Sequence, residues 1–120
     1  MKNYSVFEYC YRDASNYKSW GFLLLQGSSA PADTEDLQRQ FDSGSYFIAE
    51  QLRIPPLYAE LWAFSSGPTA DDHVWHSFSA LRPATAQEMK APVFNTLENF
   101  LQSVKAVEVW DETLSPHWDI

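Results

Sequence analysis

The stretch YRDASNYKSWGFLLLQG, from Tyr11 to Gly27, joins a polar segment to a strongly apolar one. Residues 20–26 are apolar at both sets of alternating positions, which is typical of a strand that lies centrally in a sheet. Residues 13–16 are Asp, Ala, Ser and Asn, and they favour a turn because three of these side chains hydrogen-bond to nearby backbone. Residues 3–12 are rich in Tyr, Phe and Val, which predicts a preceding strand. The stretch therefore predicts a β-hairpin with a loop of about seven residues, longer than most hairpin loops.

Two helices are predicted from capping residues and apolar spacing. Asp33 or Thr34 is suited to cap the first, and Leu37 and Phe41 lie four apart, so both would face the sheet. Asn95 is suited to cap the second, whose apolar side chains form one stripe: Leu97, Phe100, Leu101 and Val104. Both helices are amphipathic, as expected for helices that cover a sheet.

The remaining segments add strands. Residues 58–64 and 74–81 flank a loop rich in Gly, Pro and Asp, which predicts an antiparallel pair. Residues 107–110 fit a last edge strand, and residues 45–57 a short turn or strand that enters a rigid Pro-Pro corner. Thr85 and Glu88 have the spacing of a capping box. We expect one α+β domain over residues 1–120, with an antiparallel sheet of four to five strands and two main helices packed on one face.

Charge and composition disfavour several classes of function. The chain has 16 acidic and 8 basic residues and a net charge of -8, and its basic residues are scattered, so nucleic-acid binding is not expected. Cys10 is the sole cysteine, which excludes an intrachain disulfide and a cysteine-based zinc site. Neither a signal peptide nor a membrane span is evident. We expect an acidic cytoplasmic protein without a cofactor or bound metal.

The hairpin loop is the first candidate site. Its polar and aromatic side chains could form a contact surface for a ligand or a partner, since Tyr and Arg are favoured interface residues: Arg12, Asp13, Asn16, Tyr17 and Lys18. The alternative is a solvated loop in which Asp13 and Asn16 bond to backbone. Arg12 is expected to pair with a nearby carboxylate, Asp13 or one of Asp71 and Asp72.

A second candidate is the segment ADDHVWHSF, which contains His73 and His76. Two histidines three residues apart fall on opposite faces of a strand, so a two-histidine metal site is not expected. Either one could act as a general base oriented by Asp71 or Asp72, or one could fill a half-buried position in the sheet. Glu50 could line a pocket or face water at the edge of the fold.

Three stretches carry a resemblance to a known family. YRDASNYK, YFIAEQLRIPPL and DHVWHSF, in this order and at roughly this spacing, resemble a family of small uncharacterised bacterial cytoplasmic proteins. The similarity covers most of the chain, from about residue 9 to residue 111. The resemblance implies that these three stretches converge on one site, and it implies no activity, cofactor or partner.

Two functional hypotheses follow. Signatures of phosphate loops, nucleophile elbows, zinc proteases and EF-hands are missing from the sequence, while aromatic residues make up 16% of it. We expect a non-enzymatic protein-binding or accessory module, for example an antitoxin-like partner of another protein. The alternative is a small-molecule-binding protein or enzyme whose polar pocket is built from residues 11–18, Glu50, His73 and His76.

Overall fold

The hairpin predicted from the opening stretch is present in the computed structural model, which describes residues 3–12, 18–57 and 75–111. Strand β1 (Tyr4–Arg12) pairs antiparallel with β2 (Lys18–Gln26) along its whole length, from Tyr4 opposite Gln26 to Arg12 opposite Lys18. β2 begins at Lys18, two residues before the predicted start at residue 20, and residues 13–17 of the predicted loop lie outside the described residues. β1 also pairs with β4 (Trp75–Pro83) on its other edge, so it is the central strand.

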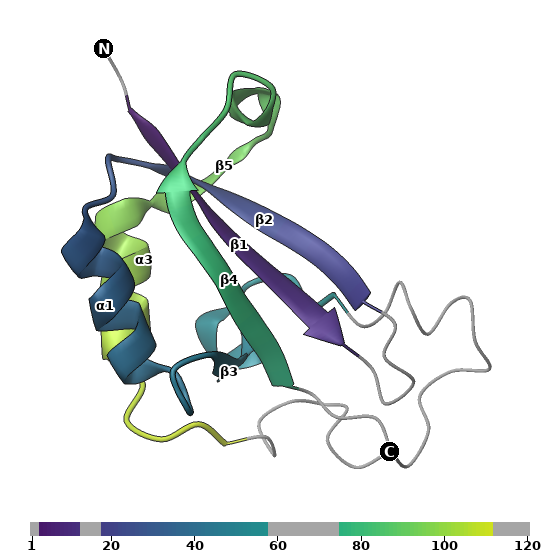
Figure 1. Ribbon diagram of the computed structural model, residues 1–120, viewed down its shortest axis with the longest axis vertical. Helices are drawn as coiled ribbons and strands as arrows, with labels where there is room; N and C mark the ends of the chain where they lie inside the picture. The colour runs from purple at the N-terminus through teal and green to yellow at the C-terminus, as the bar shows by residue number, and fades with distance from the viewer. Residues whose placement is uncertain (1–2, 13–17, 58–74, 112–120) are drawn as a thin grey trace.

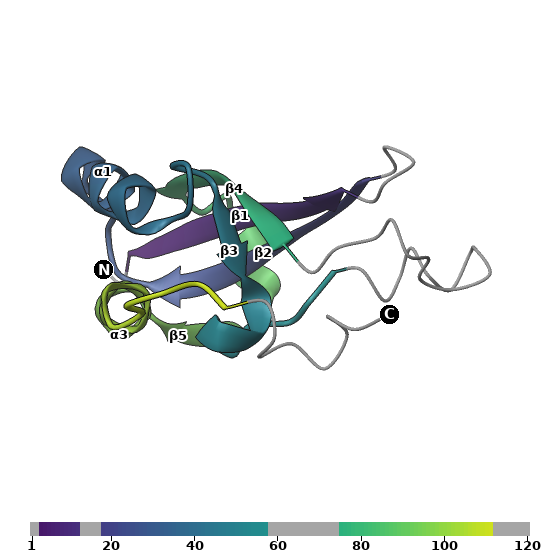
Figure 2. The ribbon, with the colours of Figure 1, turned by 90° about the horizontal axis from the view of Figure 1, so that it is seen from below.

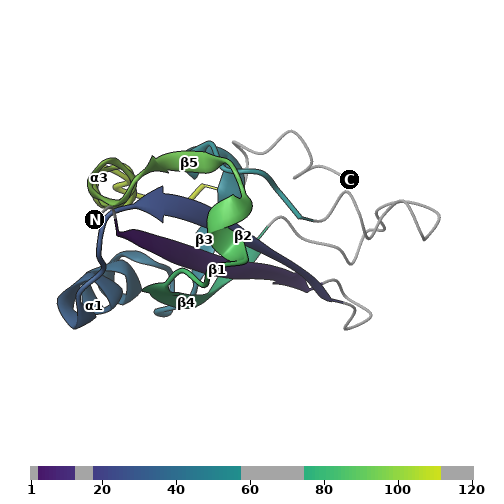
Figure 3. The ribbon, with the colours of Figure 1, turned by 90° about the horizontal axis from the view of Figure 1, so that it is seen from above.

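Among the described residues, the sheet has five strands in the order β3-β4-β1-β2-β5. It is a mixed sheet, in contrast to the antiparallel sheet that the sequence predicts. β3 (Tyr46–Ile48) is antiparallel to β4, whereas β5 (Val93–Thr96) is parallel to β2. The parallel pair arises because the connection from β4 to β5 crosses to the far edge of the sheet instead of turning back. This connection contains the 3-10 turn η2 (Glu88–Lys90), at the top of Figure 1 and seen from above in Figure 3.

The sheet curls into a half-barrel, as the view in Figure 2 makes clear. Its inner face carries Phe7 and Tyr9 of β1, and its outer face carries the alternate residues Val6 and Glu8. The Phe7 ring lies at the centre of an aromatic cluster on the inner face, within 6.2 Å, centroid to centroid, of the rings of Tyr9, Phe41, Phe47, Phe78 and Phe100. Curling brings the two edges of the inner face toward each other around this core.

Helices α1 (Pro31–Gln40) and α3 (Leu97–Lys105) lie next to each other at the end of the sheet where β1 begins (Figures 1 and 2). The core that contains Phe7 also contains Leu37 from α1 and Phe100 and Val104 from α3. The buried residues of both helices are therefore those of the predicted apolar stripes. In the sequence, α1 precedes β4 and α3 follows it, and residues of both helices pack in the same core.

Both helices begin at residues other than those predicted. Ala30 is the N-cap of α1, and the Asp33 carboxylate accepts the Ala30 backbone N–H at 2.9 Å from three residues further on. Pro31 occupies the first turn, where its missing N–H has no cost. Thr96, not Asn95, caps α3, with its hydroxyl oxygen accepting the Asn99 N–H at 3.1 Å.

The structure also describes the two segments with less regular predictions, residues 45–57 and 107–110. Residues 49–52 form the 3-10 turn η1 (Ala49–Leu52) directly after β3, and the Tyr9 hydroxyl donates to the Pro55 carbonyl at 2.7 Å, which ties the Pro-Pro corner to β1. Burial raises the pKa of Tyr9 to about 12. The predicted edge strand at 107–110 is wrong: this segment has no strand pairing, and the Trp110 indole N–H donates to the Gln40 carbonyl at 2.9 Å instead.

Other predictions have separate outcomes. The predicted strand at 58–64 lies outside the described residues, and within them the strand at 74–81 corresponds to β4, which pairs with β1 and β3. The capping box is confirmed: Glu88 N–H donates to the Thr85 hydroxyl at 3.2 Å and Thr85 N–H to the Glu88 carboxylate at 2.9 Å. In the part of the chain that the structure describes, no helix is long and apolar enough to cross a membrane.

Candidate functional site

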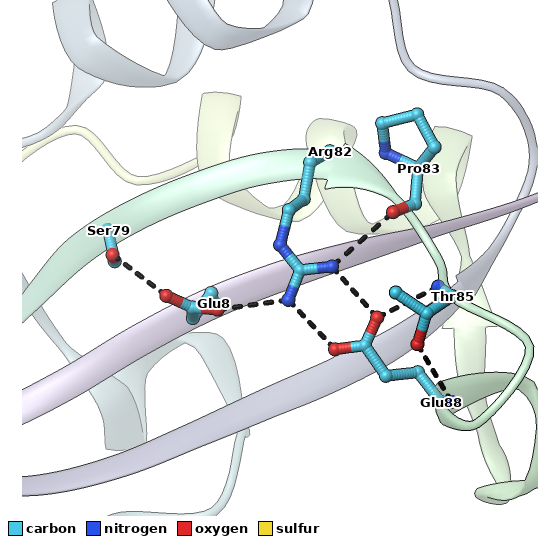
Figure 4. Close-up of polar contacts among 6 residues, drawn as sticks. All are labelled: Glu8, Ser79, Arg82, Pro83, Thr85 and Glu88. Carbon is cyan, nitrogen blue, oxygen red and sulfur yellow. Dashed lines mark hydrogen bonds and ion pairs between the residues drawn. The ribbon is translucent and has the colours of Figure 1, made fainter.

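Three charged side chains meet on the outer face of the sheet: Glu8 of β1, Arg82 of β4 and Glu88 of η2 (Figure 4). The Arg82 guanidinium donates to both Glu88 carboxylate oxygens, at 2.8 Å each, and to Glu8 Oε2 at 3.0 Å. Such a two-point contact fixes the planes of both groups, which a single ion pair does not do. The three residues come from three elements, so the contact also joins η2 to the sheet.

Local structure explains how these side chains converge. The pairing of β1 and β4 shifts register between Glu8 and Tyr9, and Ser79 lies in the extra position, from which its hydroxyl donates to Glu8 Oε1 at 3.0 Å. Arg82 lies opposite Val6, two residues from Glu8 and on the same face. The capping box with Thr85 holds Glu88 in the turn directly after β4.

The cluster contains more negative than positive charge, and its hydrogen bonds shift the pKa values of Glu88 and Arg82. Hydrogen bonds from Arg82, followed by that from the Thr85 backbone, lower the pKa of Glu88 from 4.5 to about 2. The hydrogen bonds of Arg82 to Glu88 and then to Glu8 raise the pKa of Arg82 further above its already high value. Two carboxylates and one guanidinium leave a local net charge of -1 at neutral pH. Glu88 is a permanent anion there, so the cluster holds excess negative charge in a fixed geometry.

Two aromatic side chains flank this cluster on β2. Trp20 and Phe22 are 57% and 42% exposed, and the register places Phe22 directly opposite Glu8. A hollow of about 210 Å³ lies between them, lined by Glu8, Trp20, Gly21 and Phe22. We call the five residues Glu8, Trp20, Phe22, Arg82 and Glu88 the outer-face patch. Single exposed apolar side chains are common on protein surfaces. Large apolar side chains that are exposed together are typical of an interaction site.

Further exposed apolar side chains lie in η2 and β5. Met89 follows Glu88 in η2, and Val93 and Phe94 lie in β5; all three side chains are 39% exposed or more. Val93 pairs with Leu24 of β2, the strand that carries Trp20 and Phe22. Five of the seven large exposed apolar side chains among the described residues thus belong to β2, η2 and β5.

A larger hollow of about 680 Å³ lies elsewhere, along α3 and the end of β2. Its charged lining residues are Glu98 and Lys105, which are seven residues apart on α3, or about two helical turns. Its other polar lining residues are uncharged: Gln26, Ser28, Thr96 and Gln102. Glu98 and Lys105 form no ion pair with each other, whereas Glu8 of the smaller hollow belongs to the Arg82 ion-pair cluster, so the smaller hollow is the better chemical site.

The predicted site residues are distributed over both faces. Arg12 and Lys18 are exposed and lie directly opposite each other at the end of the hairpin, on the face of Cys10 and Trp20. Of the predicted site residues, Asp13, Asn16, Tyr17 and His73 lie outside the described residues. The carboxylates expected to pair with Arg12 also lie there, so that pairing stays a prediction.

His76 lies on the inner face and is fully buried, instead of half-buried as one hypothesis expected. Its Nε2 accepts the Leu57 backbone N–H at 2.9 Å, and its ring packs against Tyr9, Tyr11 and Phe47. Glu50 lies in η1 and is partly buried. The structure therefore does not bring Arg12 and Lys18 together with His76, because the sheet separates them.

The sequence hypotheses missed all five residues of the outer-face patch. Trp20 and Phe22 alternate with the small residues Ser19 and Gly21, which was a signal for one covered and one open face, but the segment looked apolar on both. Glu88 was noted only for its capping box. Glu8 and Arg82 are 74 residues apart, and no local pattern connects them.

No group of three or more metal-ligating side chains occurs in residues 3–12, 18–57 and 75–111. No family model matches the chain, and neither a curated protein nor a solved structure is significantly similar to it. The resemblance of the three stretches to a bacterial family gains no support from these comparisons. Function is therefore inferred from the outer-face patch.

Proposed function

We propose that this protein is a non-enzymatic protein-binding module, an accessory or antitoxin-like partner of another protein, and that the outer-face patch is its contact surface. The observation that carries the proposal is the position of two exposed aromatic side chains, Trp20 and Phe22, beside the Arg82 ion-pair cluster. Trp, Tyr and Arg are the residues that most often dominate the free energy of protein association. Here the aromatic pair stands on β2 and the arginine on β4, on either side of the central strand β1.

The energetics favour association through this face. Covering a large aromatic side chain removes apolar surface from water at roughly 25 cal/mol per Å², so two half-exposed rings supply on the order of 2–4 kcal/mol. The rings stand on β2, which pairs with β1 along all nine of its residues. Side chains on a paired strand lose little backbone freedom on binding, which reduces the entropic cost of association.

The same cluster is poorly suited to acid–base catalysis. A general acid or base works best when its pKa lies near the working pH, whereas Arg82 lowers the pKa of Glu88 to about 2. His76, the one described histidine that was a candidate base, is fully buried on the inner face with Nε2 bonded to the Leu57 N–H. These features support a binding role over a catalytic one.

The test is a pull-down from extract of the native host, with proteins identified by mass spectrometry. The double variant Trp20→Ala/Phe22→Ala removes the exposed rings, and Tyr46→Ala, a similarly exposed aromatic residue on β3 at the opposite edge of the sheet, is the matched control. We expect a partner recovered by wild type and by Tyr46→Ala but lost by the double variant. Equal recovery by all three proteins would reject the outer-face patch as the contact surface.

A further inference from the structure

We infer that the hollow between Trp20 and Phe22 receives a cationic side chain, arginine or lysine, from a basic segment of the partner protein. The inference rests on the proposed function and specifies the chemistry of the partner. The hollow has two aromatic side chains at its sides, the Gly21 backbone between them and the Glu8 carboxylate at its edge. Aromatic rings and a carboxylate are the two kinds of group that attract a cation at a protein surface.

The spacing suits a flat or narrow group. Residues two apart on a strand have Cα atoms about 6.6 Å apart and point to the same face. Carbon atoms in contact lie about 3.5 Å apart, so one layer of atoms fits between two side chains at that separation. A guanidinium group or the stem of a lysine is one layer thick, whereas the branched end of a leucine is thicker.

The charge of the site selects a cation over an apolar group. Arg82 binds Glu88 through two hydrogen bonds and Glu8 through one, so the Glu8 charge is only partly matched. A carboxylate has about four lone-pair positions, and Glu8 uses two of them, for Ser79 and Arg82. An apolar group that covered Glu8 would remove the water that solvates its carboxylate and offer no interaction in return. A cation would replace the lost solvation with an ion pair. The whole chain carries -8, which attracts a basic partner from a distance.

The cations at the hairpin end do not cancel this preference. Arg12 lies four residues from Glu8 along β1, and Lys18 lies four residues from Phe22 and two from Trp20 along β2. At about 3.3 Å per residue the four-residue separations are about 13 Å, which exceeds the screening length of about 8 Å at physiological ionic strength, whereas the backbone of Lys18 is about 7 Å from that of Trp20. Glu8 is nevertheless the one charged side chain in the lining of the hollow, and both cations lie outside that lining.

The experiment uses two short blocked peptides, one of four arginines and one of four citrullines, which have the same shape without the charge. The readout is the backbone amide resonance of Gly21 in ¹⁵N-labelled full-length protein, followed by NMR during titration. We expect a saturable shift with the arginine peptide and none with the citrulline peptide. Trp20→Leu, which keeps an apolar side chain without the aromatic face, should abolish the saturable shift.

Glu8→Gln tests the contribution of the carboxylate, and it should weaken arginine-peptide binding by up to about fivefold, the upper end of the range for an exposed ion pair. Glu35→Gln is the matched control, because Glu35 is an exposed carboxylate on α1 and its removal changes the net charge equally. Binding unchanged in Glu35→Gln supports a local effect. The inference is overturned if Gly21 does not respond, if both peptides shift it equally, or if neither Glu8→Gln nor Trp20→Leu alters the response.

The two proposals can fail separately. If the arginine peptide fails at Gly21 while Trp20→Ala/Phe22→Ala still loses its partner, the cation inference is wrong and the contact surface stands. If partner recovery does not depend on Trp20 and Phe22, the proposed function is wrong whatever the peptides do. Melting temperatures of all variants, measured in parallel, confirm that each comparison is made between folded proteins.

Discussion

Arg82 and Glu88 form a two-point ion pair, with both nitrogen–oxygen distances at 2.8 Å, between the last residues of β4 and the turn η2 that follows. The same guanidinium also binds Glu8 on the neighbouring strand β1. One side chain thus holds together a strand, its neighbour and the start of the connection that crosses to β5.

Arg82→Met should destabilise the protein by about 1–2 kcal/mol, because it leaves two carboxylates close together without their shared cation. Arg39→Met is the control: Arg39 also contacts two carboxylates, Glu35 and Asp36, but its side chain is 73% exposed. The control should change the free energy of unfolding by no more than about 0.5 kcal/mol. Urea denaturation measures both, and equal losses would show that the Arg82 cluster has no special structural role.

Acid should weaken the protein partly through Glu88. The pKa of Glu88 is lowered from 4.5 to about 2 in the folded protein, so its contribution to stability is complete above pH 4.5 and is lost as the pH falls toward 2. Glu88→Gln removes this titration. The unfolding free energy of Glu88→Gln should therefore depend less on pH than that of wild type between pH 4.5 and pH 2. Parallel pH profiles for the two proteins would contradict the assignment.

His76 should matter as a buried hydrogen-bond acceptor. His76→Phe keeps an aromatic ring among Tyr9, Tyr11 and Phe47 but removes the acceptor of the Leu57 N–H, and a buried N–H without its acceptor costs about 1–3 kcal/mol. His76→Gln keeps an acceptor near the Nε2 position and should lose less. Thermal or urea unfolding distinguishes them, and a larger loss for His76→Gln would show that ring packing is the main role of His76.

We predict that the protein binds no transition metal tightly. Nε2 of His76 is occupied by the Leu57 N–H, and a histidine three positions away on a strand would point to the other face. Elemental analysis of protein purified without a metal-affinity tag should find well below one zinc per chain, and a chelator should leave the melting temperature unchanged. Stoichiometric zinc would disprove this prediction.

Local patterns in the sequence were sufficient for several elements. The pairing of β1 with β2, the apolar stripes of the two helices and the capping box at Thr85 and Glu88 depend on residues close together in the chain or on simple alternation. The exact helix starts were not predictable in this way. Ala30 is a poor capping residue by type, and it serves because Asp33 reaches back to its N–H and Pro31 follows it.

The mixed sheet and the missing edge strand depend on distant parts of the chain. β5 has only four residues, and nothing within them specifies that it lies beside β2 and parallel to it. Residues 107–110 have strand-like composition, but Trp110 and Val107 hydrogen-bond instead to Gln40, about 70 residues earlier in the chain. Competition between such contacts and local preference is decided by packing, which a sequence pattern does not contain.

The sequence by itself determined the hairpin, the acidic net charge and the supply of aromatic side chains, because these follow from alternation, turn residues and composition. Tertiary structure alone decided which aromatic side chains remain exposed: Trp20 and Phe22 look like core residues until the fold leaves the outer face beside them open. It also decided the charge cluster, since Glu8 meets Arg82 across 74 residues of chain. Exposure and long-range ion pairs depend on which strands become neighbours, and that is a property of the whole sheet.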